Sequence, residues 1–223
     1  MDEIITWDAK TREQFIEKAK NAQFDLIIIG GGITGAGVAR DAALRGISFC
    51  ILEKNDFAFG TSSRSSKLAH GGIRYLANGE FKIVRESTTE RNWLRVHLPN
   101  LVRPLGFVYT SYKGGKDKPY MIRIGTFLYD LLSDMASKFK NYKKRKYYSP
   151  KELSKIEPKV RLDGMKMAGI YYDTNVDDGR LTLETIKESI GYSDMNSVAI
   201  NYCKVIDLLT EKNNKRISGV KVI

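Results

Sequence analysis

The sequence contains little cysteine and histidine and has no long hydrophobic run. Two cysteines and two histidines occur among its 223 residues. Cys50 and Cys203 lie far apart and match neither a metal-ligand nor a disulfide pattern, so we expect no metal site and a reducing, cytoplasmic environment. No stretch approaches the ~20 apolar residues that span a bilayer. The first residues, MDEIITWD, lack the basic-then-apolar order of a signal peptide. These features disfavour a disulfide scaffold, a secreted protein and an integral membrane protein.

Positive charge, in contrast, is in excess. Lys and Arg number 37 against 26 Asp and Glu, which gives a formal net charge of +11. Ten Lys or Arg and two Glu fall between Lys138 and Arg161, so this segment, the basic block, carries a net charge of +8. Such a run is most often a solvated face, and an anionic membrane surface is an alternative partner. No nucleic-acid-binding motif accompanies the charge, so we expect no nucleic-acid partner.

The pattern of apolar residues predicts an α/β fold. Residues 24–29 and 47–53 form apolar runs that are typical of strands buried on both faces of a parallel sheet. Residues 33–45 have helical spacing and end at Gly46. This strand–helix–strand unit has the length of a right-handed crossover connection.

Further elements are predicted along the rest of the chain. Helices are expected over residues 11–23, with Thr11 as the N-cap, over 80–98, and over 180–191, with Asp178 as the cap. We predict strands at 107–111 and 165–172, and a hairpin that turns at Asn213–Asn214. Residues 124–139 form an amphipathic helix whose apolar stripe contains five side chains. They are Leu128, Leu131, Leu132, Met135 and Phe139.

A glycine motif follows the first predicted strand and begins the first buried helix. Gly30, Gly32 and Gly35 have the spacing G-x-G-x-x-G, and Glu53 ends the second strand 18 residues later. The three glycines suit a tight turn, close approach of the backbone to a pyrophosphate, and close helix–strand packing. The helix N-terminus attracts phosphates, and the acid can accept hydrogen bonds from a ribose. The motif therefore predicts a dinucleotide site.

A second motif, FGTSSRSSKLAHGGIRYL, covers residues 59–76. It combines hydroxyl side chains, cations, a histidine and the pair Gly71–Gly72. Small and hydroxyl-bearing residues allow a chain to run close to a flat polar ring system, and cations suit an anionic substrate. His97, the other histidine, precedes Pro99 at a helix end, and we interpret it as structural.

Four strings carry a family resemblance: DLIIIGGGITGAGVARDAALRG, LEKNDFAFGTSSRSSKLAHGGIRYL, MIRIGTFLYDLL and YYDTNVDDGRL. From about Asp25 onward, the chain resembles the FAD-dependent glycerol-3-phosphate dehydrogenases. The string S-S-K-L-x-H-G-G-x-R-Y-L is specific to that family rather than to flavoproteins in general.

The resemblance implies a Rossmann-like FAD-binding domain of the glutathione-reductase type, in its amino-acid-oxidase branch, with an inserted α+β substrate domain. We expect a helical extension at 1–23, the first part of the FAD domain at 24–105, and part of the substrate domain at 106–176. The second part of the FAD domain, a helix and a hairpin, is expected at 177–223. Family members are considerably longer, so we expect this polypeptide to be a truncated, N-terminal portion of such an enzyme.

The resemblance also implies site residues. Gly30, Gly32, Gly35 and Glu53 would hold the ADP half of FAD. The path toward the isoalloxazine ring would be lined by Thr61, Ser62, Ser63, Ser66 and Lys67, with His70, Gly71 and Gly72 near the ring. Arg74 and Tyr75 match positions that contact the substrate. His70 and Arg74 would be catalytic, His70 either as general base or packed against the flavin, and Arg74 as a cation for the substrate phosphate.

The implied reaction oxidises sn-glycerol 3-phosphate to dihydroxyacetone phosphate by hydride transfer to FAD. Electrons would pass on to quinone, or to oxygen in an oxidase variant, and the basic block would dock the enzyme on the inner face of the cytoplasmic membrane. Two alternatives remain open: a related flavoenzyme acting on another hydroxy acid or an amine, and a catalytically silent FAD-binding fragment. A homodimer also remains open.

Overall fold

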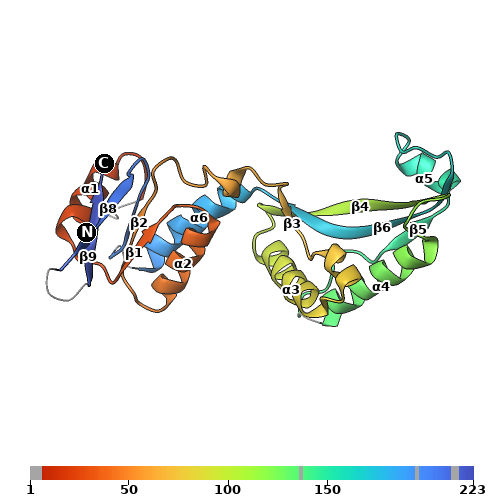
Figure 1. The fold of residues 1–223 in the computed structure, drawn as a ribbon, viewed down its shortest axis with the longest axis horizontal. Coiled ribbons are helices and arrows are strands. Elements are labelled where there is room, and N and C mark those ends of the chain that lie inside the picture. The colour runs from red at the N-terminus through yellow and green to blue at the C-terminus, as the bar shows by residue number, and fades with distance from the viewer. Residues whose placement is uncertain (1–6, 136–137, 194–195, 212–215) are drawn as a thin grey trace. The chain divides into compact units, whose positions relative to one another are not determined.

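The computed structural model describes residues 7–135, 138–193, 196–211 and 216–223. The chain divides into two compact units, one formed by Met1–Ser66 with Asp177–Ile223 and the other by Lys67–Val176. We call them unit 1 and unit 2 (Figure 1).

Unit 1 is built on a parallel three-stranded sheet of order β1-β2-β7. Its strands are β1 (Leu26–Ile29), β2 (Phe49–Leu52) and β7 (Val198–Ile200). Helices α2 (Ile33–Leu44) and α6 (Asp178–Tyr192) pack together on the sheet, and α1 (Arg12–Asn21) packs against β7. A short helix, η1 (Thr61–Ser63), precedes the crossing into unit 2, and a two-stranded hairpin comprises β8 (Val205–Thr210) and β9 (Ile217–Val222).

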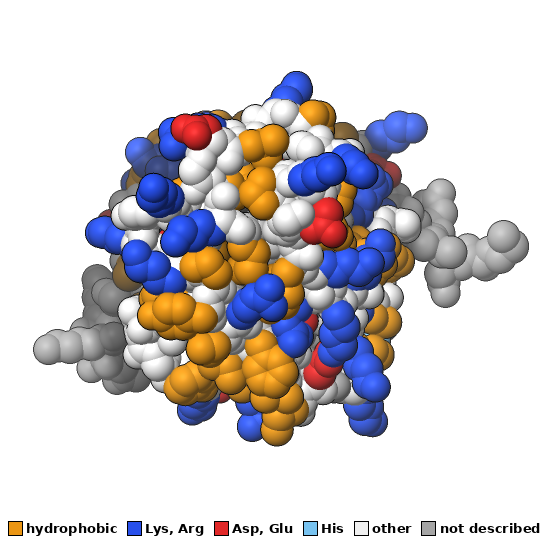
Figure 2. Space-filling view, turned by 90° about the vertical axis from the view of Figure 1, so that its right-hand side faces the viewer, with side chains coloured by type: hydrophobic (Ala, Val, Ile, Leu, Met, Phe, Trp, Pro, Cys, Tyr) orange, Lys and Arg blue, Asp and Glu red, His pale blue; other side chains and the backbone are white. Residues whose placement is uncertain are grey.

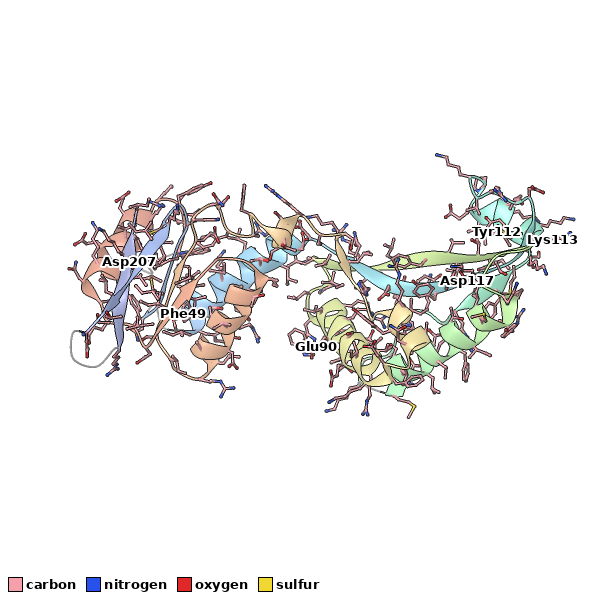
Figure 3. The ribbon with its side chains drawn as sticks, in the orientation of Figure 1. Phe49, Glu90, Tyr112, Lys113, Asp117 and Asp207 are labelled. Atoms are coloured by element: carbon pink, nitrogen blue, oxygen red, sulfur yellow. The ribbon has the colours of Figure 1, made fainter. Side chains whose placement is uncertain are left out.

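Small and apolar side chains explain this packing. All four residues of β2 are buried, and Phe49 at its start is fully buried (Figure 3). Helix α2 buries four alanines and no larger residue. Alanine faces let a helix approach a strand closely, so the glycine turn between β1 and α2 can be short.

Unit 2 is an antiparallel sheet of order β3-β6-β4, with β5 also paired to β6. The strands are β3 (Leu68–Ala69), β4 (Val102–Tyr112), β5 (Lys146–Tyr148) and β6 (Met165–Val176). Helices η2 (Ile73–Asn78), α3 (Phe81–His97) and α4 (Pro119–Met135) lie together below the sheet in Figure 1, and α5 (Pro150–Ile156) lies at its far end. Tyr112 ends β4, and Lys113 and Asp117 lie in the segment that follows it (Figure 3).

The division between units differs from the predicted boundary after residue 105. Residues 67–105 belong to unit 2, because β3 and β4 both pair with β6 and α3 packs against α4. Periodicity identified α3, α4 and parts of β4 and β6 but not β3, and it carried no information about these long-range pairings. Unit 2 ends at Val176, and unit 1 resumes at Asp177.

Helix ends were predicted less well than helix positions. Asp177, rather than Asp178, caps α6 by accepting the Arg180 amide. Thr11 occupies the N-cap position of α1 without a capping side-chain bond, and its hydroxyl donates to the Asp8 carbonyl instead. Helix α4 ends at Met135, so Phe139 lies outside it. The hairpin is confirmed, and its expected turn at Asn213–Asn214 lies outside the described residues.

Candidate functional site

The glycine turn in unit 1 has the geometry that its motif predicts. Gly30 has φ +113°, a conformation that side chains rarely adopt. A Cβ atom on Gly35 would overlap the carbonyl oxygen of Gly30. Gly32 precedes α2 in an extended conformation, and a Cβ there would lie 3.1 Å from the Ser62 hydroxyl. Glycine is therefore required at two of the three positions. Gly30 needs it for its backbone conformation, and Gly35 needs it because α2 lies close to the backbone of the glycine turn.

Glu53 and Ser62 complete the turn. The Glu53 carboxylate accepts the amides of Gly31 and Asn55, both at 2.8 Å. Each carboxylate oxygen keeps a further lone pair, so Glu53 can still accept from a ribose hydroxyl. The Ser62 hydroxyl accepts the Ile33 amide at 2.8 Å. This hydroxyl oxygen occupies the N-terminus of α2, where a phosphate oxygen is favoured by the helix dipole.

These features fit the ADP half of FAD. The turn offers backbone without side chains, a helix N-terminus already binding an oxygen atom, and a carboxylate at the end of the next strand. Along the segment that follows, Thr61 and Ser66 are exposed, and Ser62 and Ser63 are half-buried.

The remaining predicted residues lie in unit 2 around a glycine pair. Gly71 is buried, and a Cβ on it would overlap Thr88 and the Tyr129 hydroxyl. Gly72 has φ +70° and precedes η2. The amide of Gly72 donates to Nδ1 of His70 at 3.0 Å, and the His70 side chain is exposed. Lys67 has φ +58°, and its carbonyl accepts the Val176 amide. These contacts define the segment 70–72, which we call the His70 turn.

A buried polar network holds the His70 turn from below. The Gly71 amide donates to the Tyr129 hydroxyl at 2.9 Å and to the Asp173 carboxylate at 3.0 Å. Tyr129 donates to the other Asp173 oxygen at 2.8 Å. Arg91 donates to Asp173 at 2.9 Å and to the Tyr129 hydroxyl at 3.1 Å. Arg91, Tyr129 and Asp173 are 2%, 0% and 4% exposed. The ion pair is therefore desolvated and supported by neutral hydrogen bonds, as buried charges require.

Burial also fixes the protonation of Tyr129. Desolvation raises the pKa of the Tyr129 hydroxyl well above its usual value, and the neighbouring Asp173 carboxylate raises it further. The hydroxyl therefore keeps its proton and donates it to Asp173, while its lone pairs accept from Gly71 and Arg91.

Arg74 and Tyr75, the predicted substrate contacts, are exposed on η2. Burial raises the pKa of Tyr171 to about 12, and the positive charge of Arg74 offsets part of that rise. Arg74 acts in the same direction on Tyr109. Phe107 stacks on Tyr171 with ring centroids 5.4 Å apart. Arg74 thus places an exposed cation beside an aromatic side of the unit 2 sheet.

Helix α4 buries a mostly polar face and exposes most of its apolar side chains. Its buried residues are mostly polar: Ile122, Thr126, Tyr129, Asp130 and Ser133. Its exposed apolar residues form a continuous band, here called the α4 stripe. They are Tyr120, Met121, Ile124, Phe127, Leu131 and Met135. The polar face turns inward because Tyr129 and Ser133 bind Arg91. Within the described residues, no helix is both long and apolar enough to cross a membrane.

Two cations of the basic block contact α4 and are paired with its aspartates. Arg145 pairs with Asp130 at 2.9 Å, and Lys144 pairs with Asp134. The Arg145 guanidinium also lies 4.8 Å from the ring centre of Phe127 on the stripe. Lys138, Lys140 and Lys146 are exposed. Figure 2 shows Lys and Arg side chains interspersed with hydrophobic side chains on this end of unit 2.

Sequence reasoning missed Arg91, Tyr129 and Asp173 as site residues. Tyr129 and Asp173 lie within two of the strings that carry the family resemblance, but no role followed from them. Thr126, Asp130 and Ser133 lie at helical spacing on one face of the predicted amphipathic helix. A polar face opposite an apolar stripe is ordinarily solvated, so this row gave no signal of a buried partner.

Comparisons with known proteins agree with the geometry. The family described as "DAO: FAD dependent oxidoreductase" matches residues 25–222. The aerobic glycerol-3-phosphate dehydrogenase of Staphylococcus aureus (strain USA300) is 39% identical over 212 residues, which covers 95% of this chain and 37% of that protein.

Two solved structures share the fold. The glycerol-3-phosphate dehydrogenase from Bacillus halodurans, solved with FAD, matches with a TM-score of 0.67 and 31% identity. The match covers 96% of this chain and 33% of that one. The L-proline dehydrogenase from P. horikoshii matches with a TM-score of 0.62 at 20% identity, over 90% of this chain and 49% of that one, and shows the fold alone. The chain spans about a third of the length of the glycerol-3-phosphate dehydrogenases that it matches.

Proposed function

The chain belongs to the family of FAD-dependent oxidoreductases, and from that premise we propose that it takes part in the oxidation of sn-glycerol 3-phosphate to dihydroxyacetone phosphate. The observation that carries the proposal is the His70 turn, with the exposed cation of Arg74 two residues beyond it. The 39% identity to a glycerol-3-phosphate dehydrogenase supports this substrate over an amine or another hydroxy acid.

Each unit, taken by itself, contains proposed FAD contacts. In unit 1, Gly30, Gly32 and Gly35 admit the pyrophosphate to the backbone, and Glu53 accepts from the ribose. In unit 1, Thr61, Ser62, Ser63 and Ser66 are further proposed cofactor contacts. In unit 2, the proposed contacts are Lys67 and the His70 turn. Bound FAD supplies a hydride acceptor, and the protein must bind and orient the substrate beside it.

Arg74 and Tyr75 are the proposed substrate residues of unit 2. A phosphate dianion needs cationic donors, and the planar guanidinium can donate two parallel hydrogen bonds to it. Tyr75 lies beside Arg74 on η2, and its exposed hydroxyl can donate to a substrate oxygen. His70 is the proposed catalytic residue at the reacting carbon.

Anaerobic reduction of the flavin-loaded protein tests the proposal. We expect sn-glycerol 3-phosphate to bleach the oxidised flavin absorbance, whereas glycine and L-proline leave it unchanged. Arg74→Ala should keep the flavin but need a much higher substrate concentration. Reduction by an amino acid, or no reduction by any of the three compounds, would contradict the proposal. Reoxidation by a soluble quinone or by oxygen then identifies the electron acceptor.

We further propose that unit 2 docks on an anionic membrane surface. The α4 stripe supplies apolar side chains and the exposed lysines of the basic block supply positive charge, the combination typical of peripheral binding. Lys144 and Arg145 contribute less than their number suggests, because each is paired with an aspartate.

Sedimentation with phosphatidylserine vesicles tests this docking. We expect binding that weakens with salt and that falls in Ile124→Gln/Leu131→Gln and in the quadruple variant with glutamine at Lys138, Lys140, Lys146 and Lys151. The matched control neutralises four exposed lysines of unit 1, Lys10, Lys187, Lys204 and Lys221. Equal losses of vesicle binding in the two quadruple variants would show that net charge alone accounts for the binding. Unchanged sedimentation of the Ile124→Gln/Leu131→Gln variant would refute the role of the α4 stripe.

A further inference from the structure

The two histidines of the chain have opposite hydrogen-bond partners at Nδ1. In His70, Nδ1 lies 3.0 Å from the backbone nitrogen of Gly72. In His97, Nδ1 lies 2.8 Å from the carbonyl oxygen of Trp93. A backbone N–H can only donate and a carbonyl can only accept. A neutral His70 therefore carries its proton on Nε2, and a neutral His97 carries it on Nδ1.

The buried polar network beneath the His70 turn holds its backbone in place. The Gly71 amide is held by two acceptors, Tyr129 and Asp173, and both are fixed by Arg91. A side chain on Gly71 would overlap Tyr129, so the backbone lies directly on the network. Gly72 takes the left-handed conformation that aims its N–H at His70. The direction of that N–H is therefore set by residues on α3, α4 and β6.

We propose that His70 acts as a hydrogen-bond donor through Nε2–H, and that Arg91, Tyr129 and Asp173 are positioning residues that fix this tautomer through the turn. The lone pair of Nδ1 is occupied by Gly72, so the neutral ring has no free basic nitrogen. This assignment replaces the expected general base with a donor to an oxygen of the substrate or flavin. The tautomer follows from the hydrogen bond between Gly72 and His70. Only the identity of the oxygen that accepts from Nε2–H rests on the proposed function.

Nitrogen-15 spectroscopy tests the tautomer directly. The chain holds two histidines, so a sample labelled in histidine gives two imidazole patterns, and His97→Gln assigns them. At a pH where both rings are neutral, long-range proton–nitrogen correlation should show the Nε2–H form for His70 and the Nδ1–H form for His97. The Nδ1–H form at His70 would overturn the proposal.

Substitutions in the network test the positioning role. Tyr129→Phe removes one of the two acceptors of the Gly71 amide. Asp173→Asn keeps an acceptor oxygen for Gly71 but removes the carboxylate charge that pairs with Arg91 and the oxygen that accepts from Tyr129. In both variants we expect the His70 pattern to move toward an average of the two tautomers. In Tyr129→Phe the Gly71 amide, which loses one of its acceptors, should exchange about tenfold faster, as expected for the loss of one buried hydrogen bond. His97 serves as an internal reference in every sample.

Ser133→Ala is the matched control. Ser133 is fully buried in the same network, and its hydroxyl bonds Arg91 and Asn92. It should lower stability while leaving the His70 pattern unchanged. An unchanged pattern in folded Tyr129→Phe and Asp173→Asn, or an equal change in Ser133→Ala, would overturn the positioning role. Should either acceptor variant fail to fold, the other variant and the wild-type spectrum still decide.

Kinetics of the flavin-loaded protein separate donor from base. Glutamine retains an N–H near the position of Nε2, so His70→Gln should keep more of the glycerol 3-phosphate oxidation rate than His70→Ala. Equal loss in both variants would contradict the donor role. If glycerol 3-phosphate is not oxidised at all, the proposed function fails while the tautomer measured by nitrogen-15 stands independently.

Discussion

Replacing Gly35 by alanine tests the close contact between the glycine turn and α2. A Cβ at this position would overlap the Gly30 carbonyl oxygen and lie 3.2 Å from a methyl group of Ile28. The overlapped atom belongs to the backbone, so α2 must shift away from β1. Forced overpacking of this kind costs about 3 kcal/mol. Alanine gains about 1 kcal/mol over glycine within a helix, so the expected net loss is about 2 kcal/mol.

Gly37→Ala is the matched control on the same helix. A Cβ on Gly37 meets no described atom within 4 Å, so this variant should gain about 1 kcal/mol from helix propensity alone. The two substitutions are chemically identical and two residues apart, yet we expect opposite signs and a difference of about 3 kcal/mol.

Tryptophan fluorescence during thermal unfolding provides the assay. Trp7 lies in unit 1, where its indole donates to the Ala199 carbonyl, and Trp93 lies in unit 2. In a Trp93→Phe background, Trp7 reports on unit 1 alone. At about 4 °C per kcal/mol, Gly35→Ala should lower Tm by about 8 °C, and Gly37→Ala should raise it by about 4 °C. Similar Tm values for the two variants would refute the reasoning.

Three further predictions concern buried groups. Asp173→Ala should destabilise unit 2 by about 3–5 kcal/mol, because Arg91 remains buried without its carboxylate; a loss below 1 kcal/mol in urea unfolding would contradict this. Burial raises the pKa of Cys50 to about 12, so a thiol reagent should modify Cys50 only after denaturation. Rapid modification of Cys50 in the folded Cys203→Ser variant would contradict this. Burial raises the pKa of Tyr171 from 10.0 to about 12. The folded state then holds a proton that the unfolded chain loses, so stability is full below pH 10 and falls between pH 10 and 12 by up to about 1.4 kcal/mol per pH unit. Tyr171→Phe should reduce that fall, and an unchanged pH profile in the variant would argue against it.

Local signals were sufficient for the dinucleotide half of the site. The apolar runs, the glycine spacing and the position of Glu53 are all encoded within about thirty residues, and the structure has each where it was expected. Helix α2 begins at Ile33 as predicted, because Gly32 ends the turn. Short-range chemistry therefore specifies this part of unit 1.

The substrate half depends on contacts that are distant in sequence. Gly71 is held by Tyr129 and Asp173, which lie 58 and 102 residues away. The orientation of α4 follows from the buried Arg91, whose charge draws the polar face of that helix inward. Hydrophobic periodicity identified an amphipathic helix but did not establish which of its faces is buried. A buried charge outweighs an apolar stripe because leaving it unpaired costs more than exposing several apolar side chains.

A calorimetric titration with FAD tests the central claim, that this chain holds the ADP half of the cofactor on its glycine turn. We expect one FAD per chain, competition by free ADP, and weakened binding in Gly35→Ala with binding retained in Gly37→Ala. No FAD binding by the wild-type chain, or binding that ADP and Gly35→Ala leave unchanged, would contradict the claim.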